Sequence, residues 1–512
     1  MKKLTLVLVL VFSFTLLLSV LTFGCVVFAA GTSGSVVTYA QENKEILEKL
    51  EVDGKPAEVL PEGLISPEDN RNTDLRIKLD KMIDEYGPRM AEMSDWLYYN
   101  PESSYIEYNT SKMLGEELKK YNFEVTYGVE GLAENYNSVI QDRFGAGGLP
   151  TAFVAKYKGK SESPVIAFVF DPDALRAPAR EKGAFHGCQH NMQGPVALGT
   201  AINLAKLMEE NNLPGSVWVI LTPAEETPPA TKTNMTKAGI FDGVDVVFKS
   251  HGFGPVAQRS KGGLGNCCYL MNMTLYEFYG KSAHASRAWG GRDALDAARL
   301  FLTAVDMQRE HSEPEFRFMS AILDTPVAAN SVADYVLVDH WNRHADPAGQ
   351  KALDEKALKI DQIAQGAAMA TFCEVKIKRY SNNYNGIESA WFNNLYWEYL
   401  KEYGDSEAIS EELGKPTGWD EGGYSAVNIL GITVNPAIAN VPELAGHSDE
   451  NADITITDQG HEALVQNAKI SGAMALRLIF DPKLMATVLE EQVRWQEYGL
   501  KSGLITEDMI QK

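Results

Sequence analysis

Cysteine is scarce in this chain, and the few cysteines do not suggest disulfides. Five occur among 512 residues, at Cys25, Cys188, Cys267, Cys268 and Cys373. Cys267 and Cys268 are adjacent and therefore poorly placed to pair with each other. The sequence thus predicts no disulfide framework. Cys188 needs another explanation, and metal ligation is the leading one.

Positive charge is also in short supply. Lysine and arginine number 47 against 69 acidic residues, a net charge of −22. Nucleic acids and anionic lipid surfaces are bound by basic faces, so the charge balance argues against both as partners. The sequence shows no dinucleotide fingerprint, no Walker loop and no internal repeat. With 45% hydrophobic and 23% charged residues, it predicts a globular protein of two or three domains.

The N-terminus has the pattern of an exported protein. Lys2 and Lys3 precede a long apolar run that ends in small residues near position 29. Residues 1–29 are therefore predicted to be a secretory signal peptide. A retained membrane anchor and a lipid anchor at Cys25 are the alternatives, because the run is long enough to span a bilayer. All three interpretations predict an extracytoplasmic protein, secreted or held in the cell envelope.

Four separated segments carry side chains of the kinds that bind metals. Three of these segments follow predicted strands, and ligands in open α/β sheets bind outside the carboxyl ends of the strands. A thiolate with imidazoles and carboxylates suits zinc, with manganese or cobalt as alternatives. The candidates are His186, Cys188 and His190; the pair Glu225 and Glu226; His251; and His447.

The paired glutamates suggest a division of labour. One carboxylate binds metal, while its neighbour takes a proton from a water that the metal activates and later donates it to a leaving amine. The alternative, a solvated charge pair, is less usual directly after an apolar run such as VWVILTPA.

The motifs, in order, resemble a known family. HGCQHNMQGPVALGTA is similar to the H-x-C-G-H-[DN] motif of metallo-amidohydrolases of the aminoacylase, hippurate hydrolase and p-aminobenzoyl-glutamate hydrolase type, and TPAEET to their PAEE. FYGKSAHASRAWGGRDALDAA and NSVADY resemble the family's lid segments, and WLYYNPESSYIEYNTSKMLGEELKKYNFEV its N-terminal part. The likeness runs from about residue 75 to 482.

The resemblance implies an α/β fold, in which a zinc-peptidase-like domain with a mostly parallel sheet carries an inserted α+β lid or dimerisation domain. The implied organisation is a signal peptide at 1–29, a linker at 30–64, a catalytic domain at 65–265 and 386–482, the lid at 266–385 and a C-terminal tail at 483–512.

The resemblance also assigns roles to residues. It implies two divalent ions, zinc first and manganese or cobalt next. The implied metal ligands are Cys188, His190, Glu226, His251 and His447, with Cys188 bridging the ions. Glu225 matches the general base, and His284 the lid histidine that reaches the active site, typically of the other subunit. Asn330 and Arg292 either meet a substrate carboxylate or hold the lid. Asp173 and Asp420 are expected to support the site from behind its ligands.

Departures from the family pattern put the substrate in doubt more than the metal site. Gln189 replaces the usual glycine, Asn191 often appears as aspartate, and Gln193 stands where many relatives have histidine. His461 is a rival to His447. We favour His447 because it precedes a loop-like segment, whereas His461 opens a predicted helix.

The sequence therefore predicts an exported, metal-dependent amidohydrolase. Its expected substrate is an N-acyl or N-aroyl amino acid, of the aminobenzoyl-glutamate kind, or a small peptide. The alternatives are a dipeptidase or carboxypeptidase on the same fold, or an extracytoplasmic binding protein without catalysis. A homodimer through the lid is expected, with any membrane attachment confined to the N-terminus.

Overall fold

The computed structural model describes residues 35–61, 64–65, 73–145, 147–227, 229, 231–264, 269–325, 328–383, 386–414, 427–507 and 510. The predicted signal peptide, Cys25 and Asp420 lie outside these residues. Among the described residues, no helix combines the length and apolar character that crossing a membrane requires.

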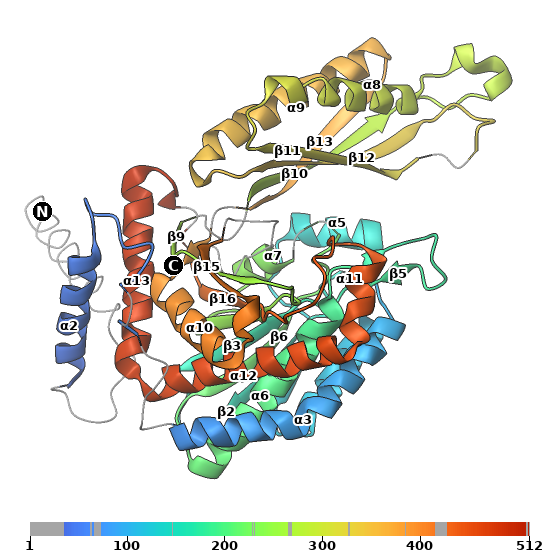
Figure 1. Cartoon of the computed structure of the whole chain (residues 1–512). Helices are drawn as coiled ribbons and strands as arrows, with labels where there is room; N and C mark the ends of the chain where they lie inside the picture. Colours follow the sequence, from blue (N-terminus) through green and yellow to red (C-terminus); the bar gives the residue numbers. More distant parts are fainter. Residues whose placement is uncertain are drawn as a thin grey trace, which may run out of the picture.

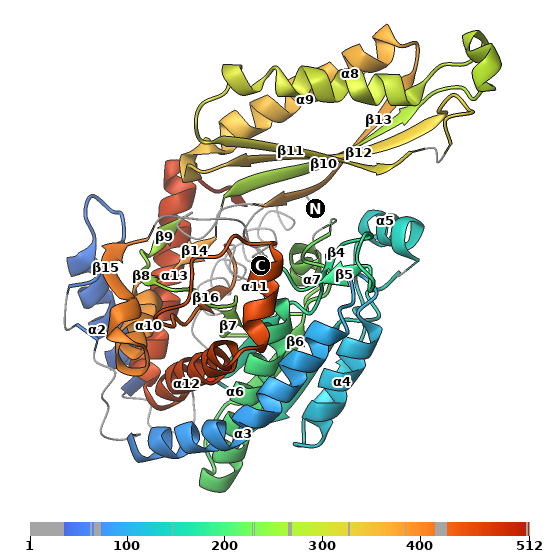
Figure 2. The ribbon, with the colours of Figure 1, turned by 45° about the vertical axis from the view of Figure 1, so that its right-hand side comes forward.

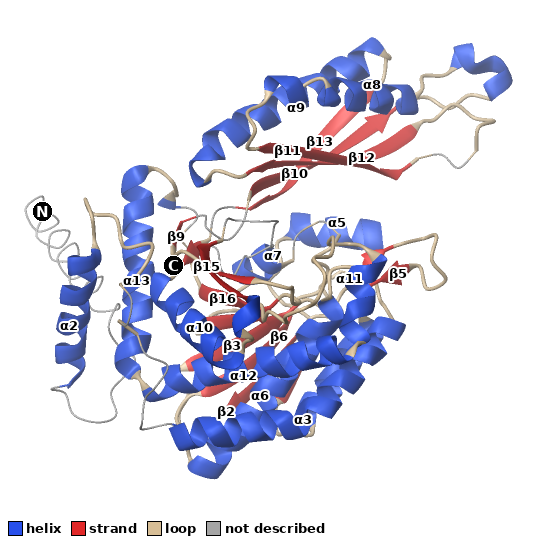
Figure 3. Cartoon of the chain, in the orientation of Figure 1, coloured by secondary structure: helices blue, strands red, loops and turns tan. Residues whose placement is uncertain are grey.

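A six-stranded sheet forms the centre of the larger layer (Figures 1 and 3). Four neighbouring strands are parallel, while the edge pair β1 and β2 runs antiparallel. In sheet order the strands are β1 (Glu124–Tyr127), β2 (Phe153–Lys158), β6 (Ser216–Leu221), β3 (Val165–Phe170), β7 (Val246–Ser250) and β16 (Leu430–Val434). This mostly parallel sheet confirms the predicted α/β class.

Helices cover both faces of this sheet, which is why its inner strands read as continuous apolar runs. Along β3, Ile166 and Phe168 pack on one face, and Ala167 and Val169 on the other. The first face is covered by α3 (Thr73–Tyr99), α4 (Tyr108–Lys119), α6 (His190–Asn211), α10 (Ala390–Tyr403) and α12 (Asp458–Phe480). The second is covered by α5 (Glu134–Phe144) and α7 (Lys232–Lys237).

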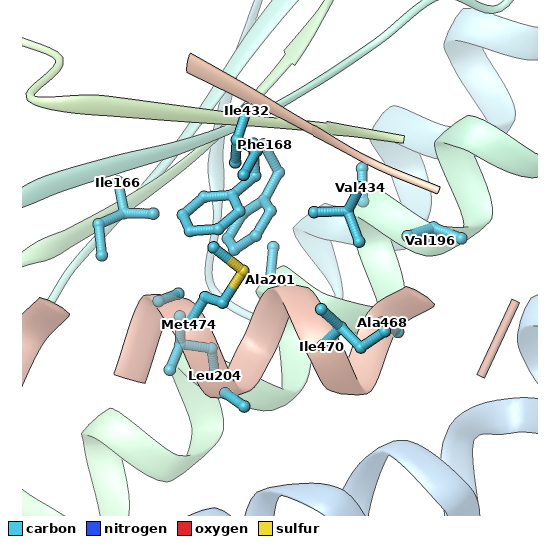
Figure 4. Close-up of a cluster of buried hydrophobic side chains, with 14 of the residues drawn as sticks. Ile166, Phe168, Val196, Ala201, Leu204, Ile432, Val434, Ala468, Ile470 and Met474 are labelled. Atoms are coloured by element: carbon cyan, nitrogen blue, oxygen red, sulfur yellow. The ribbon is translucent and has the colours of Figure 1, made fainter. Parts of the chain in front are cut away.

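The main core lies between the sheet and the helices α6 and α12. Figure 4 shows Phe168 and Ile432 from the strands above Met474 and Leu204 from the helices. All four side chains are buried. Burying an aliphatic or aromatic side chain contributes about 1.5–3 kcal/mol, so this packing fixes the sheet and the strand ends that it presents.

A second layer of antiparallel strands and helices lies apart from the first (Figure 1). Its sheet order is β11 (Phe316–Asp324), β12 (Tyr335–His344), β10 (Leu270–Tyr279) and β13 (Glu374–Asn383). One face packs against α8 (Ala294–Asp306) and α9 (Gln350–Ala370). This layer falls within the range expected for the lid, whose boundaries and motion stay predictions.

Short elements join and flank the layers. The chain enters and leaves the second layer through β9 (Gly263–Leu264) and β14 (Ile387–Glu388), which pair with each other. Figure 2 shows α5, α7 and α11 on the side of the larger layer that faces the second. The remaining elements are β4 (Leu175–Arg176), β5 (Ala184–Phe185), β8 (Ala257–Arg259), β15 (Ile409–Leu413), α11 (Asp449–Asp453), η1 (Ala285–Gly290), η2 (Arg309–His311), η3 (Pro347–Gly349), η4 (Ser406–Ala408) and η5 (Ile454–Ile456).

Two helices lie in the segments predicted to be a linker and a C-terminal tail. α2 (Ser35–Leu50) packs against α13 (Pro482–Ser502). The amide of Asn43 donates to the carbonyl of Lys483 at 3.3 Å, and Arg494 pairs with Glu51. Leu47 and several α13 side chains are buried in the main core. Residues 35–50 and 482–502 are therefore helices that pack against each other and against the main core, and the predicted domain boundaries stay predictions.

Candidate metal centre

The predicted ligands converge at one edge of the central sheet. Asp173 follows β3, the glutamate pair follows β6, and His251 follows β7 directly. Because these three strands are parallel neighbours, their carboxyl ends meet at the same edge. Cys188 and His190 arrive at the start of α6, whose packing under the sheet fixes where that helix begins.

The ligand atoms of the five predicted metal ligands lie close together. Cys188, His190 and His251 form one set, and Cys188, Glu226 and His447 form another, each with its ligand atoms within 4.8 Å of one another. The Sγ of Cys188 is 3.5 Å from the Nε2 of His251, and the Nε2 of His447 is 3.7 Å from a Glu226 oxygen. The two sets share the sulfur of Cys188, as a bridging ligand would.

Two buried polar atoms in this cluster have no hydrogen-bond partner. They are the Nε2 of His190 and the Oε1 of Glu226. A buried polar atom without a partner is rare and needs an explanation, such as an ion. Sulfur, imidazole nitrogen and carboxylate oxygen together suit a transition-metal cation. The residues present therefore fit the implied metals.

Asp173 contacts two of the predicted ligands. The Nδ1 of His190 lies 3.0 Å from the Asp173 carbonyl oxygen and 3.3 Å from its Oδ1. The Oδ2 of Asp173 accepts hydrogen bonds from the hydroxyl of Ser104 at 2.6 Å and from the backbone N–H of Glu226 at 2.9 Å. A proton held on Nδ1 leaves Nε2 of His190 free to bind a cation, which is how such partners tune metal ligands.

Glu225, the predicted general base, lies beside His190. One of its oxygens is 3.8 Å from the Nε2 of His190. Burial and the neighbouring Glu226 carboxylate raise the pKa of Glu225 to about 8, and the same two causes raise the pKa of the Cys188 thiol to about 12. The site thus gathers groups whose negative forms are disfavoured until a positive charge arrives.

The backbone before Glu225 is held by a residue that the sequence did not reveal. Ala224 has a φ of +58°, a left-handed conformation that is uncommon for alanine. Its N–H donates to the Oε1 of Glu107 at 2.9 Å, and the Oε2 of Glu107 accepts from the hydroxyl of Thr151 at 2.9 Å. Glu107 is fully buried and 117 residues away along the chain, so no local pattern marks it.

The three predicted lid residues lie outside this cluster, and the segments of His284 and Asn330 are paired. The N–H of Ala285 donates to the carbonyl of Asn330 at 2.9 Å, and the backbone of His284 pairs with that of Ser331 in an isolated antiparallel β-bridge. His284, Arg292 and Asn330 are exposed, and none belongs to the metal-type clusters found among the described residues. Figure 1 shows the yellow-green helix η1, which follows His284, at the outer end of the second layer.

Arg343 on β12 carries a charge near the donor cluster and was not singled out from the sequence. It is half-buried, and its Nε has no hydrogen-bond partner. Burial lowers the pKa of Arg343, and the negative charge of Glu225 opposes that shift, so the guanidinium lies within electrostatic reach of the metal centre. Alternation along β12 places it with Asp339 and Trp341, on the sheet face opposite α8 and α9.

His461 does not join the cluster. Its Nε2 contacts a carboxylate oxygen of Asp95 at 2.9 Å, at the start of α12. Among the described residues, His447 lies in a group of metal-type donors and His461 does not.

The chain matches a family model and is similar to known proteins over much of its length. The model of the peptidase family M20/M25/M40 matches residues 167–469, more than half of the chain. Xaa-Arg dipeptidase of Mus musculus is 28% identical over 81% of this chain and 92% of its own length. One of the subunits of p-aminobenzoyl-glutamate hydrolase of Escherichia coli is 27% identical over 65% of this chain and 66% of its own length.

Among solved structures, a dinuclear metal-binding peptidase of Bacillus subtilis superposes with a TM-score of 0.50. The two are 20% identical, and the match covers 78% of this chain and 99% of that one. This likeness supports the fold.

Proposed function

The chain belongs to the peptidase family M20/M25/M40 and is a hydrolase of amide or peptide bonds; from this premise we propose that it is an exported two-metal amidohydrolase of N-acyl or N-aroyl amino acids. The observation that carries the proposal is the pair of donor sets that share Cys188 beside the Glu225 carboxylate. Zinc is the expected metal, because thiolate and imidazole ligands favour it, with manganese or cobalt as alternatives.

Each donor has a role in this proposal. Cys188, His190, Glu226, His251 and His447 would hold the two cations. Bound cations would polarise the scissile carbonyl and lower the pKa of a water from ~16 toward ~7. Glu225 takes the proton of the attacking water on its carboxylate and delivers it to the leaving amine nitrogen. Asp173 keeps the Nδ1 of His190 protonated and its Nε2 available.

Removal of metal tests this function directly. Protein treated with a chelator and dialysed is expected to lose turnover of N-acyl amino acids and dipeptides, and to regain it with zinc, manganese or cobalt. A titration should end at two ions per chain. Hydrolysis that persists in protein shown by elemental analysis to hold no divalent ion would contradict the proposal.

Arg343 supports a substrate with a free carboxylate beside the scissile amide. Its guanidinium lies within electrostatic reach of Glu225 and has an unpartnered N–H, and arginine binds carboxylates in a fixed, two-pronged geometry. The substrates named for the two relatives, an Xaa-Arg dipeptide and p-aminobenzoyl-glutamate, both carry such a carboxylate. A dipeptidase activity is therefore the second candidate.

Replacement of this arginine separates binding from chemistry. Arg343→Gln should raise KM for carboxylate substrates by about 10- to 100-fold, because a hydrogen bond to a charged group contributes about 1.5–3 kcal/mol. Steady-state kinetics on a substrate and on its C-terminal amide measure this, and the amide should be insensitive to the substitution. Arg317→Gln is the matched control, since Arg317 is the exposed cross-strand neighbour on β11. Equal losses on both substrates would refute a carboxylate role.

A homodimer and export complete the proposal. His284 is exposed and outside the donor cluster of its own chain, which fits a histidine that completes the site of a second subunit and stabilises a developing oxyanion. Asn330 lies beside it through backbone contacts. A solution mass of one chain would contradict the dimer. Export rests on the N-terminal sequence, and fractionation of the host cell tests it.

A further inference from the structure

Gln189 stands between two proposed metal ligands in a conformation that disfavours its side chain. It lies between Cys188 and His190, with a φ of +61°, and caps the start of α6. Glycine adopts this left-handed conformation freely, whereas residues with a Cβ resist it. The glutamine is nevertheless almost fully buried, at 4% exposed. A costly residue kept at this point needs a compensating interaction.

The side-chain amide supplies that interaction through three hydrogen bonds to two other segments. Its Oε1 accepts from the backbone N–H of Phe253 at 2.9 Å. Its Nε2 donates to the carbonyl of Asn451 at 3.2 Å and to the Oδ1 of Asn451 at 3.0 Å. Phe253 comes two residues after His251, and Asn451 comes four residues after His447. One amide thus contacts the loop that carries His251 and the short helix α11, which follows the loop of His447.

Further contacts close the same ring of loops. The Nδ2 of Asn451 donates to the carbonyl of Gly187 at 2.7 Å, and the N–H of His447 donates to the same carbonyl at 2.9 Å. Gly252, directly after His251, has a φ of +66°, and a Cβ there would lie 2.1 Å from the Oε1 of Gln189. The His251 loop therefore approaches the amide as closely as a glycine allows.

We propose that Gln189 is a positioning residue that cross-links the three loops carrying Cys188, His190, His251 and His447, and so presets the geometry of the metal centre. This inference rests on the proposed function, since it takes those four residues as metal ligands. Groups that orient ligands from behind typically change metal affinity about 10- to 100-fold when they are lost.

A side chain that only fills space would give a different result when it is replaced by glycine. Replacing a left-handed residue by glycine relieves backbone strain, so Gln189→Gly should be harmless if the side chain only packs. If the amide cross-links the loops, the same variant should bind Zn²⁺ about 10- to 100-fold more weakly. The matched control is Asn212→Gly, at the other end of the same helix. Asn212 is also left-handed, with a φ of +51°, but it is exposed and caps the C-terminus of α6.

The experiment measures Zn²⁺ affinity by competition with a chromophoric chelator, on metal-free full-length protein whose folded state is checked by thermal melting. We expect weaker binding in Gln189→Gly and unchanged binding in Asn212→Gly. Asn451→Ala removes the Oδ1 acceptor of the Gln189 amide and the Nδ2 donor to Gly187. It should weaken binding too, while the double variant should lose less than the sum of the two. Asn451→Ala carries the test alone if Gln189→Gly does not fold.

The outcomes are distinguishable. Wild-type affinity in both Gln189→Gly and Asn451→Ala overturns this inference and leaves the proposed function intact. Wild-type protein that binds no Zn²⁺, Mn²⁺ or Co²⁺ overturns both.

Discussion

Glu225→Gln is expected to lose about 10²–10⁴-fold in kcat, the usual contribution of a general base, while it keeps its metal. The amide retains the shape of the side chain but cannot take a proton from the attacking water. KM should change little, because the proton transfer occurs in the transition state and not on binding. Single-turnover kinetics on an N-acyl amino acid, with elemental analysis of the same sample, measures both effects.

The geometry also defines how this prediction fails. Glu225 belongs to a third group of ligand-type atoms, with His190 and Glu226, within 4.8 Å of one another. If Glu225→Gln lost metal together with activity, Glu225 would be a ligand and Glu226 the candidate base. Glu181→Gln is the control, since Glu181 is an exposed glutamate in the β4–β5 loop and undergoes the same change of charge. It should retain wild-type turnover.

The sequence indicates that the predicted donors converge, because several of them can be placed at strand ends from their own stretches of sequence. His251 and the pair Glu225 and Glu226 each follow a run of apolar strand residues, and parallel neighbours bring such ends together. Asp173 was placed behind a ligand by the family resemblance; it contacts His190 and the backbone of Glu226, and its supporting role stays a prediction.

The parts that the sequence did not reveal depend on long-range geometry. Glu107 meets Ala224, in the TPAEET segment, across 117 residues, and the contact cannot be read from either segment alone. The alternation of side chains along β12 shows which residues share a sheet face with Arg343. It does not show that this face lies near Glu225. Gln189 was noted as a departure from glycine, yet only its backbone φ and its amide contacts show why that departure matters.

The packing of α2 on α13 was missed for another reason. The sequence from 35 to 50 is polar on average, and helices of marginal propensity are stabilised by the surface they meet. Here that surface includes α13, to which Asn43 donates a hydrogen bond. A single sequence shows the helix only weakly and its partner not at all.

Asp171→Ala should cause the largest loss of stability of any single substitution considered for this chain. The Asp171 carboxylate pairs with the Nζ of Lys232 at 2.8 Å and with the Nζ of Lys249 at 2.6 Å, and accepts from the hydroxyl of Thr222 at 2.7 Å. Both lysine side chains and the aspartate are fully buried. Removing one partner of a buried ion pair costs about 3–5 kcal/mol, because the remaining charge stays desolvated.

The expected loss of stability comes from the two lysine cations that Asp171→Ala leaves buried without the charge of the aspartate. This cause can be distinguished by experiment from the loss of packed side-chain volume. Chemical denaturation of the metal-free protein should show a lower midpoint for Asp171→Ala, and the double variant Asp171→Ala with Lys249→Met should recover part of the loss by removing one uncompensated charge. Glu162→Gln, in the exposed pair with Lys158, should leave the midpoint unchanged because solvent screens that pair. A double variant no more stable than Asp171→Ala would show that the carboxylate acts through its hydrogen bond to Thr222 and its volume, rather than through charge. In that case the charge of Asp171 would add nothing to the alignment of β3 and β7 beneath the metal centre, which backbone pairing and packing would hold.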